Sequence, residues 1–546
     1  MSQTLEAVTP DLVSALAEAV WIGPDHGAPA PAGSRPADLL RGAFDSDGVT
    51  TLRCWVTAHG VYELFVNGVR VGDRELAPGF TAYRKRLQVQ DHDLDGLLVP
   101  GRNTIAVLLS DGWFRGRHGF ERRADGFGTR TGLLLSVLDP SGRTVLATDA
   151  GWECRPSHIT AADLMDGQVE DRRLLDPSWF TGGGDGWRPV EPVTGDLVED
   201  RFRLVAHEGP VTRRLARIEP VTLTRPRPGT VVLDLGESVN GRLHLADLGP
   251  AGTRLVLTHG EVVDADGLVS TEHLRAFTFA TQQLLPAGQI DEVISAGRPG
   301  EVFEPRHTTH GFRFVQVDGV PDGLDFSGTY AVLVGDDLPR TGEFACSDAR
   351  LERLHEVVRR SLVTNACAVP TDCPQRERSG FTGDWQVFVG TAALLADVSA
   401  FSNRWLRDLA ADQWADGRVP TVVPNPGGDQ PSGVPFEDGS AGSAGWGDAA
   451  VLVPWELWRA YGDAEALAEQ FPAMCRWVDY AAGSAAGARH PERAAARPEP
   501  SAHERYLWDT GFHFGEWLEP GVPPNLDPRL DHGIVATAYL HRSALL

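Results

Sequence analysis

Alternating apolar and polar residues dominate the first part of the chain, residues 1–205. TLRCWV (51–56) places its apolar residues on one face, and VYELFV (61–66) alternates in the same way. The Asn-Gly pair at 67–68 follows directly and predicts a type I′ hairpin turn. The run NTIAVLLSDGWF (103–114) is more continuously apolar, as expected for a strand buried on both faces. Short strands between Gly- and Pro-rich turns predict a β-sandwich domain here.

A second β-rich part covers residues 206–338. TVVLDLG (230–236), GRLHLADLG (241–249) and TRLVLTHGEVV (253–263) are three expected strands, and FRFVQVDG (312–319) is a fourth with clean alternation. Strands at this spacing are typical of a sandwich, so we expect a second β-sandwich domain.

The apolar period becomes helical after residue 338. Ser347 is expected to cap a helix whose apolar positions are Leu351, Leu354, Val358 and Leu362. Two long loops rich in Gly, Pro and acidic residues are expected at 417–446 and 484–530. Further helices are predicted at about 384–398, 400–415, 447–460, 464–481 (with Pro472 starting its second part) and 531–546.

The loop 371–386, TDCPQRERSGFTGDWQ, is the strongest candidate for a functional site. It brings together three carboxylates and two guanidinium groups, those of Asp372, Glu377, Asp384, Arg376 and Arg378. Glycine and proline residues break its periodicity, and an apolar helix follows it. Loops held by a rigid scaffold often carry chemistry. The alternative is a surface loop with ordinary ion pairs.

Charge restricts the possible partners. Fifty Lys and Arg residues against seventy-five Asp and Glu residues give a formal charge of −25, which repels phosphate backbones and anionic lipid. No apolar run approaches the roughly twenty residues that span a bilayer. We therefore expect neither nucleic acid nor a membrane as a partner, and the patterns do not predict an oligomeric state.

Six scattered cysteines, at positions 54, 154, 346, 367, 373 and 475, form no CxxC pair. The N-terminal segment also lacks the basic start of a secretory signal, so we expect reduced thiols in a cytoplasmic protein. Cys373 is interpreted as a packing residue rather than a nucleophile. No residue spacing indicates a metal or cofactor site.

Two further groups of residues invite a functional interpretation, but a structural one is preferred. The first group is interpreted as core aromatics rather than a sugar site: Tyr62, Trp113 and Phe114. The second group is interpreted as histidines at turns or sheet edges, near strand ends: His259, His307 and His310.

Residues 372–388, DCPQRERSGFTGDWQVF, resemble the signature of the bacterial α-L-rhamnosidases. The resemblance extends along most of the chain from about Trp21. YELFVNGVRVGDRELAPGFTAYRKRLQVQDHDL and LLSDGWFRGR resemble the family's N-terminal sandwich, and LDLGESVNGRLHL, LTHGEVVDADG and HGFRFVQVDG resemble its lectin-like β domain. WGDAAVLVPWELWRAYGD, FPAMCRWVDYAA, FGEWL and IVATAYLHRSALL resemble successive helices of its catalytic barrel.

The resemblance implies a multidomain β + α fold. Two β-sandwich domains, 1–205 and 206–338, are followed by the first part of an (α/α)6 barrel, 339–546. It also implies hydrolysis of terminal α-L-rhamnosides with inversion, on a rhamnose-containing glycoside and without a cofactor.

Site residues are implied in the same way. Glu377 matches the family's general acid, and Asp372, Arg376 and Asp384 match residues that hold the hydroxyls of the sugar ring. The pocket walls resemble the family's at Trp446 and Trp517. Phe381 stands where the family has Trp, and Glu516 stands where it has Asp.

The chemistry of the loop agrees with an acid role for Glu377, apart from one conflict. Glycoside cleavage needs a proton donor and a second carboxylate. Arg376 and Arg378 flank Glu377 and should lower its pKa, whereas a general acid needs a raised one. We therefore expect Asp372 or Asp384 to lie nearer to the Glu377 carboxyl than either guanidinium does.

Only six helices are predicted after residue 338, whereas the implied barrel has twelve. We expect the chain to be a fragment, with the general base beyond its end. Weaker candidates for the base within the chain are Glu437, Asp438, Asp448 and Glu516. Two other functions are considered: a non-catalytic carbohydrate-binding protein, and an (α/α)6 glycosidase for another sugar, for which Phe381 would set the preference.

Overall fold

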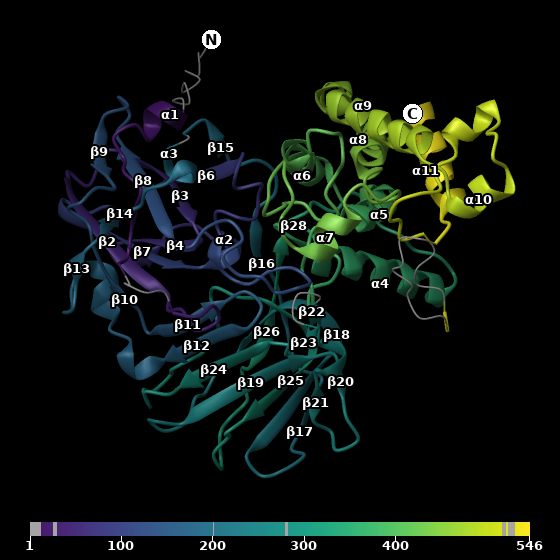
Figure 1. Ribbon diagram of the computed structural model, residues 1–546. Coiled ribbons are helices and arrows are strands. Elements are labelled where there is room, and N and C mark those ends of the chain that lie inside the picture. Colours follow the sequence, from purple (N-terminus) through teal and green to yellow (C-terminus); the bar gives the residue numbers. More distant parts are fainter. Residues whose placement is uncertain (1–11, 26–29, 200, 279–281, 516–519, 522–529) are drawn as a thin grey trace.

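The computed structural model describes residues 12–25, 30–199, 201–278, 282–515, 520–521 and 530–546. Two β-rich parts precede a helical part that ends the chain (Figure 1). This mixed architecture confirms the predicted fold class.

The first β-rich part is a sandwich of two sheets. One sheet has the order β14 (Glu191–Pro192), β1 (Ile22–Gly23), β8 (Gly132–Leu138), β3 (Arg53–His59), β6 (Leu87–Asp93) and β15 (Leu204–Ala206), with β9 (Thr144–Ala147) paired to β8. The other has the order β13 (Arg188–Pro189), β10 (Glu153–Pro156), β2 (Asp38–Ser46), β7 (Gly101–Ser110), β4 (Val61–Val66) and β5 (Val69–Arg70). Val56 and Leu135 of the first sheet share one apolar core with Leu64 and Val107 of the second.

Strand alternation explains this packing. Leu64 and Val66 of β4 face the inner core, whereas Phe65 packs on the opposite face against Trp179. Asn67 and Gly68 both have positive φ values, 52° and 84°, which confirms the predicted hairpin between β4 and β5. The predicted core aromatics are also buried: Tyr62, Trp113 and Phe114.

The second β-rich part centres on a nine-stranded sheet. Its order is β11 (Ile159–Asp163), β12 (Gly167–Asp171), β24 (Ile290–Ile294), β19 (Arg254–Gly260), β25 (His310–Asp318), β18 (Thr230–His244), β26 (Tyr330–Asp336) and β16 (Thr212–Ile218), with β17 (Thr222–Thr224) paired to β18. The two strands predicted at 230–236 and 241–249 are one strand, β18, because a register shift between Asp234 and Val239 lets it continue.

The two β-rich parts share this sheet. β11 and β12 come from residues before 205, and β12 pairs in parallel with β24. The boundaries expected at 205 and 338 stay predictions, and the hydrogen bonding crosses the first of them. Three minor ladders pair β20 (Val262–Val263) with β21 (Val269–Ser270), β22 (Phe277–Thr278) with β23 (Gln283–Leu284), and β27 (Ala366–Cys367) with β28 (Val369–Pro370).

The predicted helices form close to their expected bounds. They are α4 (Ala349–Asn365), α5 (Thr382–Leu395), α6 (Ser399–Asp412), α8 (Ala449–Tyr461), α9 (Ala464–Gly487) and α11 (Gly533–Leu545). The expected cap at Ser347 is wrong: Asp348 caps α4, because its carboxylate accepts the Arg350 N–H. α9 runs through Pro472 as one helix.

Short helices interrupt the segments expected to be loops. α7 (Pro435–Ser440) and α10 (Pro491–Ala496) lie in the two long connections, and α1 (Leu12–Ala15), α2 (Gly112–Arg115) and α3 (Asp196–Glu199) lie in the first β-rich part. Short 3-10 helices occupy Arg172–Leu174, Pro177–Thr181, Arg201–Arg203, Glu272–Leu274 and Ala502–Tyr506. A search of the described helices finds none with the length and apolarity to cross a bilayer.

Buried charges tie the helical part to the β-rich parts. Arg404 of α6 donates to Asp336 Oδ2 (2.8 Å) and to the Ala368 carbonyl (2.8 Å). Arg86 donates to Asp408 Oδ1 at 3.1 Å. These contacts hold α6, and the turn between β27 and β28, against the sheets.

Candidate functional site

The charged loop 371–381 connects β28 to α5 and is closed by its own hydrogen bonds. The Asp372 N–H donates to the Ser379 carbonyl at 3.0 Å, and the Ser379 N–H donates to Asp372 Oδ1 at 2.9 Å. At its start, the Thr371 N–H donates to the Asn365 carbonyl at the end of α4 (2.8 Å). Glu377 therefore lies on a turn whose two ends are fixed.

The Cys373 thiol lies between two carboxyl groups. Its Sγ is 2.8 Å from Asp372 Oδ2 and 3.0 Å from Glu377 Oε2. The Glu377 N–H points to the same sulfur at 3.4 Å. Glu377 is 6% exposed. Cys373 thus does more than pack: it bridges the two carboxyls that were singled out in the sequence, although a thiol has one proton to donate.

The two guanidinium groups beside Glu377 behave differently. Arg376 holds Glu377 Oε1 through Nη2 (2.8 Å) and Nε (2.9 Å). Arg378 points the other way, to the carbonyls of Leu164 and Thr309 and to Gln289 Oε1 (2.8 Å). A carboxyl was expected to lie nearer to Glu377 than either guanidinium does. Asp372 does share a hydrogen bond with Glu377, but Arg376 contacts the same carboxyl directly.

The carboxyl pair shares its protons unequally. Burial, together with the hydrogen bond and the charge of Glu377, raises the pKa of Asp372 well above its usual range. Burial would also raise the pKa of Glu377, but hydrogen bonds from Asp372 and Cys373 and the Arg376 guanidinium bring that pKa below its usual value. The expected offset at Glu377 is therefore not seen, and the pair carries its proton on Asp372.

A cavity of about 400 Å³ opens beside the loop, bounded by α4, α5 and Trp446. Asp372 and Asp384 line it, and Asp384 is exposed there. Trp446 stacks on Phe514 with ring centroids 3.9 Å apart. The structure thus brings three of the residues that were predicted for the site into one cavity: Asp372, Asp384 and Trp446.

Other predicted residues lie elsewhere. The described residues that line the cavity do not include Arg376, Glu377 or Phe381. Phe381 precedes α5 and forms a β-bridge with Val422. Trp517 and Glu516 lie outside the described residues.

Sequence reasoning missed part of the cavity wall. Ser361 and Asn365, at the end of α4, and Trp385, in the first turn of α5, all line it. Their position on either side of the charged loop is the signal that could have found them. Within the described structure the indole nitrogens of Trp385 and Trp446 are buried without a hydrogen-bond partner.

Two of the candidate bases are used locally. Asp448 accepts hydrogen bonds from Gly445 N (2.8 Å), Trp477 Nε1 (3.0 Å) and Ser543 Oγ (2.5 Å). Asp438 accepts hydrogen bonds from Ser432 N (2.6 Å) and Gly433 N (2.8 Å). Burial, and then the charges of Asp438 and Glu121, raise the pKa of the third candidate, Glu437, to about 7.

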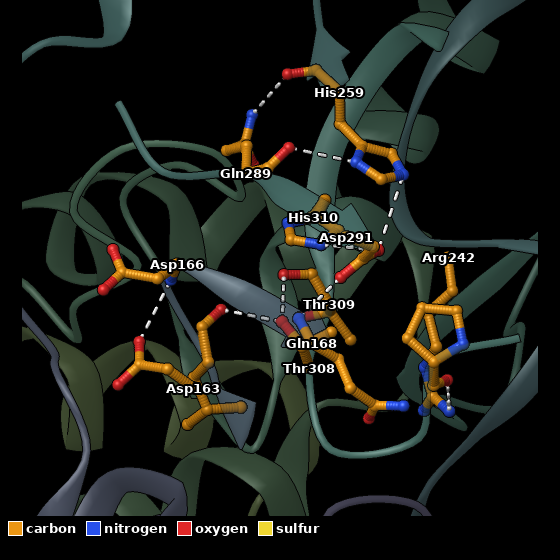
Figure 2. A network of polar contacts seen from close by, with 12 residues as sticks. Asp163, Asp166, Gln168, Arg242, His259, Gln289, Asp291, Thr308, Thr309 and His310 are labelled. Carbon is orange, nitrogen blue, oxygen red and sulfur yellow. Dashed lines mark hydrogen bonds and ion pairs between the residues drawn. The ribbon is translucent and has the colours of Figure 1, made fainter. Parts of the chain in front are cut away.

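Below the loop lies a buried polar network (Figure 2). His310 Nε2 is 3.0 Å from Asp291 Oδ2, and His259 Nε2 is 3.8 Å from the same oxygen. The expectation of turn or edge histidines is wrong here, because β19 and β25 are interior strands and both rings are fully buried. His307 is also buried, with Nδ1 2.7 Å from Ser110 Oγ.

In this His–Asp–His cluster the ligand atoms of His259, Asp291 and His310 lie within 4.8 Å of one another, close enough to hold a metal ion, and burial raises the pKa of Asp291 to about 6. The two imidazoles stack at 4.2 Å with planes 20° apart, so their lone pairs lie in near-parallel planes. Burial, and then the neighbouring His310, lower the pKa of His259 to about 3. Arg378 and Arg242 add positive charge beside His310.

Comparison with known proteins identifies the family of each part of the chain. Three domain models match successive parts of the chain. They are the alpha-L-rhamnosidase N-terminal domain (residues 47–213), the bacterial alpha-L-rhamnosidase concanavalin-like domain (224–334) and the bacterial alpha-L-rhamnosidase six-hairpin glycosidase domain (339–546).

Similar proteins carry the same name. The chain is 34% identical to an alpha-L-rhamnosidase of Streptomyces avermitilis over 96% of its own length and 47% of that protein. A crystal structure of alpha-L-rhamnosidase from that organism complexed with L-rhamnose superposes with a TM-score of 0.80 at 32% identity, over 94% of this chain and 46% of that one. Native alpha-L-rhamnosidase from Aspergillus terreus gives 0.83 at 31% identity, over 96% and 58%.

The chain spans about half the length of the curated relatives that it matches. All three of its parts nevertheless match models of one family in the order seen here. The chain therefore belongs to the bacterial α-L-rhamnosidase family.

Proposed function

We propose that this chain provides the sugar-binding and proton-donating part of an enzyme that hydrolyses terminal α-L-rhamnosides with inversion. The observation that carries the proposal is the carboxyl pair Asp372–Glu377, bridged by Cys373 at the edge of a cavity lined by Asp384 and Trp446. Acid-catalysed glycoside cleavage requires a proton donor, and burial beside Glu377 raises the pKa of Asp372 well above its usual range, so the pair holds a proton to a higher pH than a free carboxyl does.

In the proposed reaction the Glu377 carboxyl gives its proton to the glycosidic oxygen as the bond from that oxygen to the anomeric carbon breaks. A water molecule adds to the opposite face of the sugar and loses a proton to a general base, which inverts the anomeric configuration. The family relationship and the retained acid residue support this scheme.

The proton must pass from Asp372 to Glu377 before it can be donated. Asp372 lines the cavity, so a sugar hydroxyl that donates a hydrogen bond to it would stabilise its anion and lower its pKa. The shared proton would then favour Glu377. In this scheme substrate binding causes Glu377 to take up the proton. Before the sugar arrives, Arg376 holds the Glu377 carboxylate in place.

The sugar contacts are assigned by analogy with the family. Asp384 is exposed in the cavity and can accept two neighbouring hydroxyls, and Trp446 offers an apolar wall that suits the methyl group of a 6-deoxy sugar. Roles for Arg376, Phe381 and Trp517 in sugar binding stay predictions. The identity of the general base also stays open among the predictions, and Asp438 and Asp448 are engaged in local hydrogen bonds.

Two alternatives are addressed by the same residues. A non-catalytic carbohydrate-binding protein has no use for a proton-sharing pair, so that pair favours an enzyme. A related glycosidase for another sugar is tested by comparing isosteric sugars. Cytoplasmic location, and the exclusion of nucleic acid and membranes as partners, remain predictions from charge and cysteine distribution.

The test is release of L-rhamnose from an aryl α-L-rhamnoside by the chain, its Glu377→Gln variant and a control, Glu465→Gln, at an exposed site of α9. Where the chain is active, we expect Glu377→Gln to lose about 10²–10⁴-fold in rate, the usual contribution of a general acid, while the control is unchanged. Rhamnose binding without activity in any of the three proteins would agree with a general base that this chain does not supply. Rhamnose binding by calorimetry is measured in parallel. A variant as active as the wild type would refute the acid role, and absence of both activity and rhamnose binding would refute the proposed function.

A further inference from the structure

Arg378 is a buried cation held by neutral groups. It follows Glu377 in the chain, is 9% exposed and has a left-handed φ of 52°. Its acceptors are the two carbonyls and the Gln289 amide oxygen described above. In the described part of the chain no carboxylate pairs with it at salt-bridge distance, and burial lowers its pKa to about 10. Its place is therefore set by the acceptors.

Gln289 is the side-chain acceptor, and both the oxygen and the nitrogen of its amide are hydrogen-bonded; Figure 2 shows the contact of its nitrogen with the His259 carbonyl. Oε1 accepts from Arg378 Nη2 (2.8 Å) and from the Gly311 N–H (3.1 Å). Nε2 donates to the carbonyls of Gly311 (3.0 Å) and His259 (3.3 Å). Gln289 is fully buried just before β24, so one amide links β19, β25 and the charged loop.

Gly311 is the second contact between the sheet and the loop. A Cβ at this position would lie 2.6 Å from the Pro374 carbonyl carbon and 2.7 Å from the Gln375 nitrogen. The loop backbone thus rests directly on Gly311, whose own N–H and carbonyl are held by Gln289. Supports at 374–375 and at 378 bracket Glu377 on both sides.

Backbone strain shows that these contacts are needed. Gln289 also has a left-handed φ, 62°, so the hydrogen bond between Gln289 and Arg378 joins two non-glycine residues in that region. Such a conformation is uncommon for residues other than glycine and persists only where the surroundings impose it.

We propose that Gln289, a residue of the second β-rich part, is a positioning residue for the Asp372–Glu377 pair, acting through Gly311 and Arg378. The inference rests on the proposed function for its catalytic meaning, since it concerns the same carboxyl pair. It also assigns a role to the concanavalin-like part, because the sheet of that part fixes the position and orientation of the charged loop 371–381.

The test reads the loop through Cys373, whose thiol lies between the two carboxyls. Burial, and then the charges of Asp372 and Glu377, hold the pKa of Cys373 well above its usual range. If Gln289→Met lets the loop shift, that pKa falls toward its usual value, and each unit gives about tenfold more thiolate at a fixed pH. We therefore expect iodoacetamide to alkylate Cys373 at least tenfold faster in Gln289→Met, as measured residue by residue with peptide mass spectrometry.

The matched control is Gln413→Met. Gln413 is also buried, and its amide donates to the carbonyls of Gly417 (2.9 Å) and Ala473 (3.2 Å) in the helical part. This variant loses a comparable buried amide but should leave Cys373 alkylation unchanged, and the exposed Cys346 serves as the internal reference in both proteins. Equal acceleration in the two variants would overturn the proposal, because it would report general destabilisation.

A second variant keeps the test decisive if Gln289→Met does not fold. Gly311→Ala removes no hydrogen bond but places its methyl group against the Pro374 backbone, so it should also accelerate Cys373 alkylation. Unchanged alkylation in every folded variant contradicts the proposal. Where the chain hydrolyses a rhamnoside, Gln289→Met should lower kcat more than it raises KM. A third outcome separates the two proposals. If Cys373 is alkylated faster in the variants but even the wild type does not bind rhamnose, the proposed function is refuted and the positioning role stands.

Discussion

Gly383 shows how closely the cavity wall is packed. A Cβ at this position would lie 2.5 Å from the Trp446 ring, closer than Cβ contacts in real structures, and the same ring stacks on Phe514. We expect Gly383→Ala to push Trp446 into the cavity and weaken rhamnose binding about tenfold or more, as measured by calorimetry, since about 1.4 kcal/mol of lost contact gives a factor of ten.

The control for Gly383→Ala is Gly439→Ala. Gly439 also lies in a helix, α7, and a Cβ there meets nothing within 4 Å. Equal affinity in Gly383→Ala and the wild type would mean that Trp446 does not form the sugar wall.

At the residue scale, the sequence predicts which groups meet but not how they are charged. Asp372, Asp384 and Trp446 could be assigned because they belong to a recognisable motif, and they do share a cavity. The direction of the Arg378 side chain could not be predicted, because its acceptors Leu164, Gln289 and Thr309 are distant in sequence. The bridging role of Cys373 also depends on how the loop folds back.

At the scale of single elements, a glycine inside α9 and a glycine at the end of α8 offer a contrast. Gly483 is exposed inside this helix, and a Cβ there meets nothing within 4 Å. Glycine inside a helix is about 1 kcal/mol less favourable than alanine, so Gly483→Ala should raise the free energy of unfolding by about that amount in denaturant titrations.

Gly462→Ala should have the opposite sign. Gly462 ends α8 with a left-handed φ of 71°, which alanine adopts at a cost of about 1–2 kcal/mol. If both substitutions shift the unfolding midpoint in the same direction, helix propensity and backbone strain do not control these two sites.

Elements themselves were predictable where a local rule dominates. The Asn-Gly hairpin and the amphipathic helices follow from turn chemistry and period, which act over a few residues. The single strand β18 could not be predicted, because the register shift inside it is set by pairing with β25, some seventy residues later. Likewise, Asp348 rather than Ser347 caps α4 because the chain enters the helix one residue later than expected.

At the scale of the whole molecule, Arg404 connects the helices to the second sheet. Its guanidinium bonds Asp336, which is 2% exposed, so Arg404→Ala would leave a buried carboxylate without its partner. Removing one partner of a buried pair usually costs about 3–5 kcal/mol. We expect a loss of that order in equilibrium unfolding followed by tryptophan fluorescence.

Arg350→Ala is the comparison for that loss. Arg350 pairs with Asp348 on the surface with 91% of its side chain exposed, and solvent screens such exposed pairs so that they contribute little. A similar, small change in both variants would show that the junction between helices and sheets adds little to stability.

The hairpin of β11 and β12 limits how parts of this chain could be exchanged with those of a relative. Because β12 pairs in parallel with β24, a chimera joined at residue 205 would place a borrowed strand at the edge of a native sheet. A mismatched strand would leave backbone groups of β24 free to pair with another molecule. A junction before residue 159 instead keeps the hairpin with its sheet. In a chimera, residues 159–171 should therefore come from the same protein as the second β-rich part.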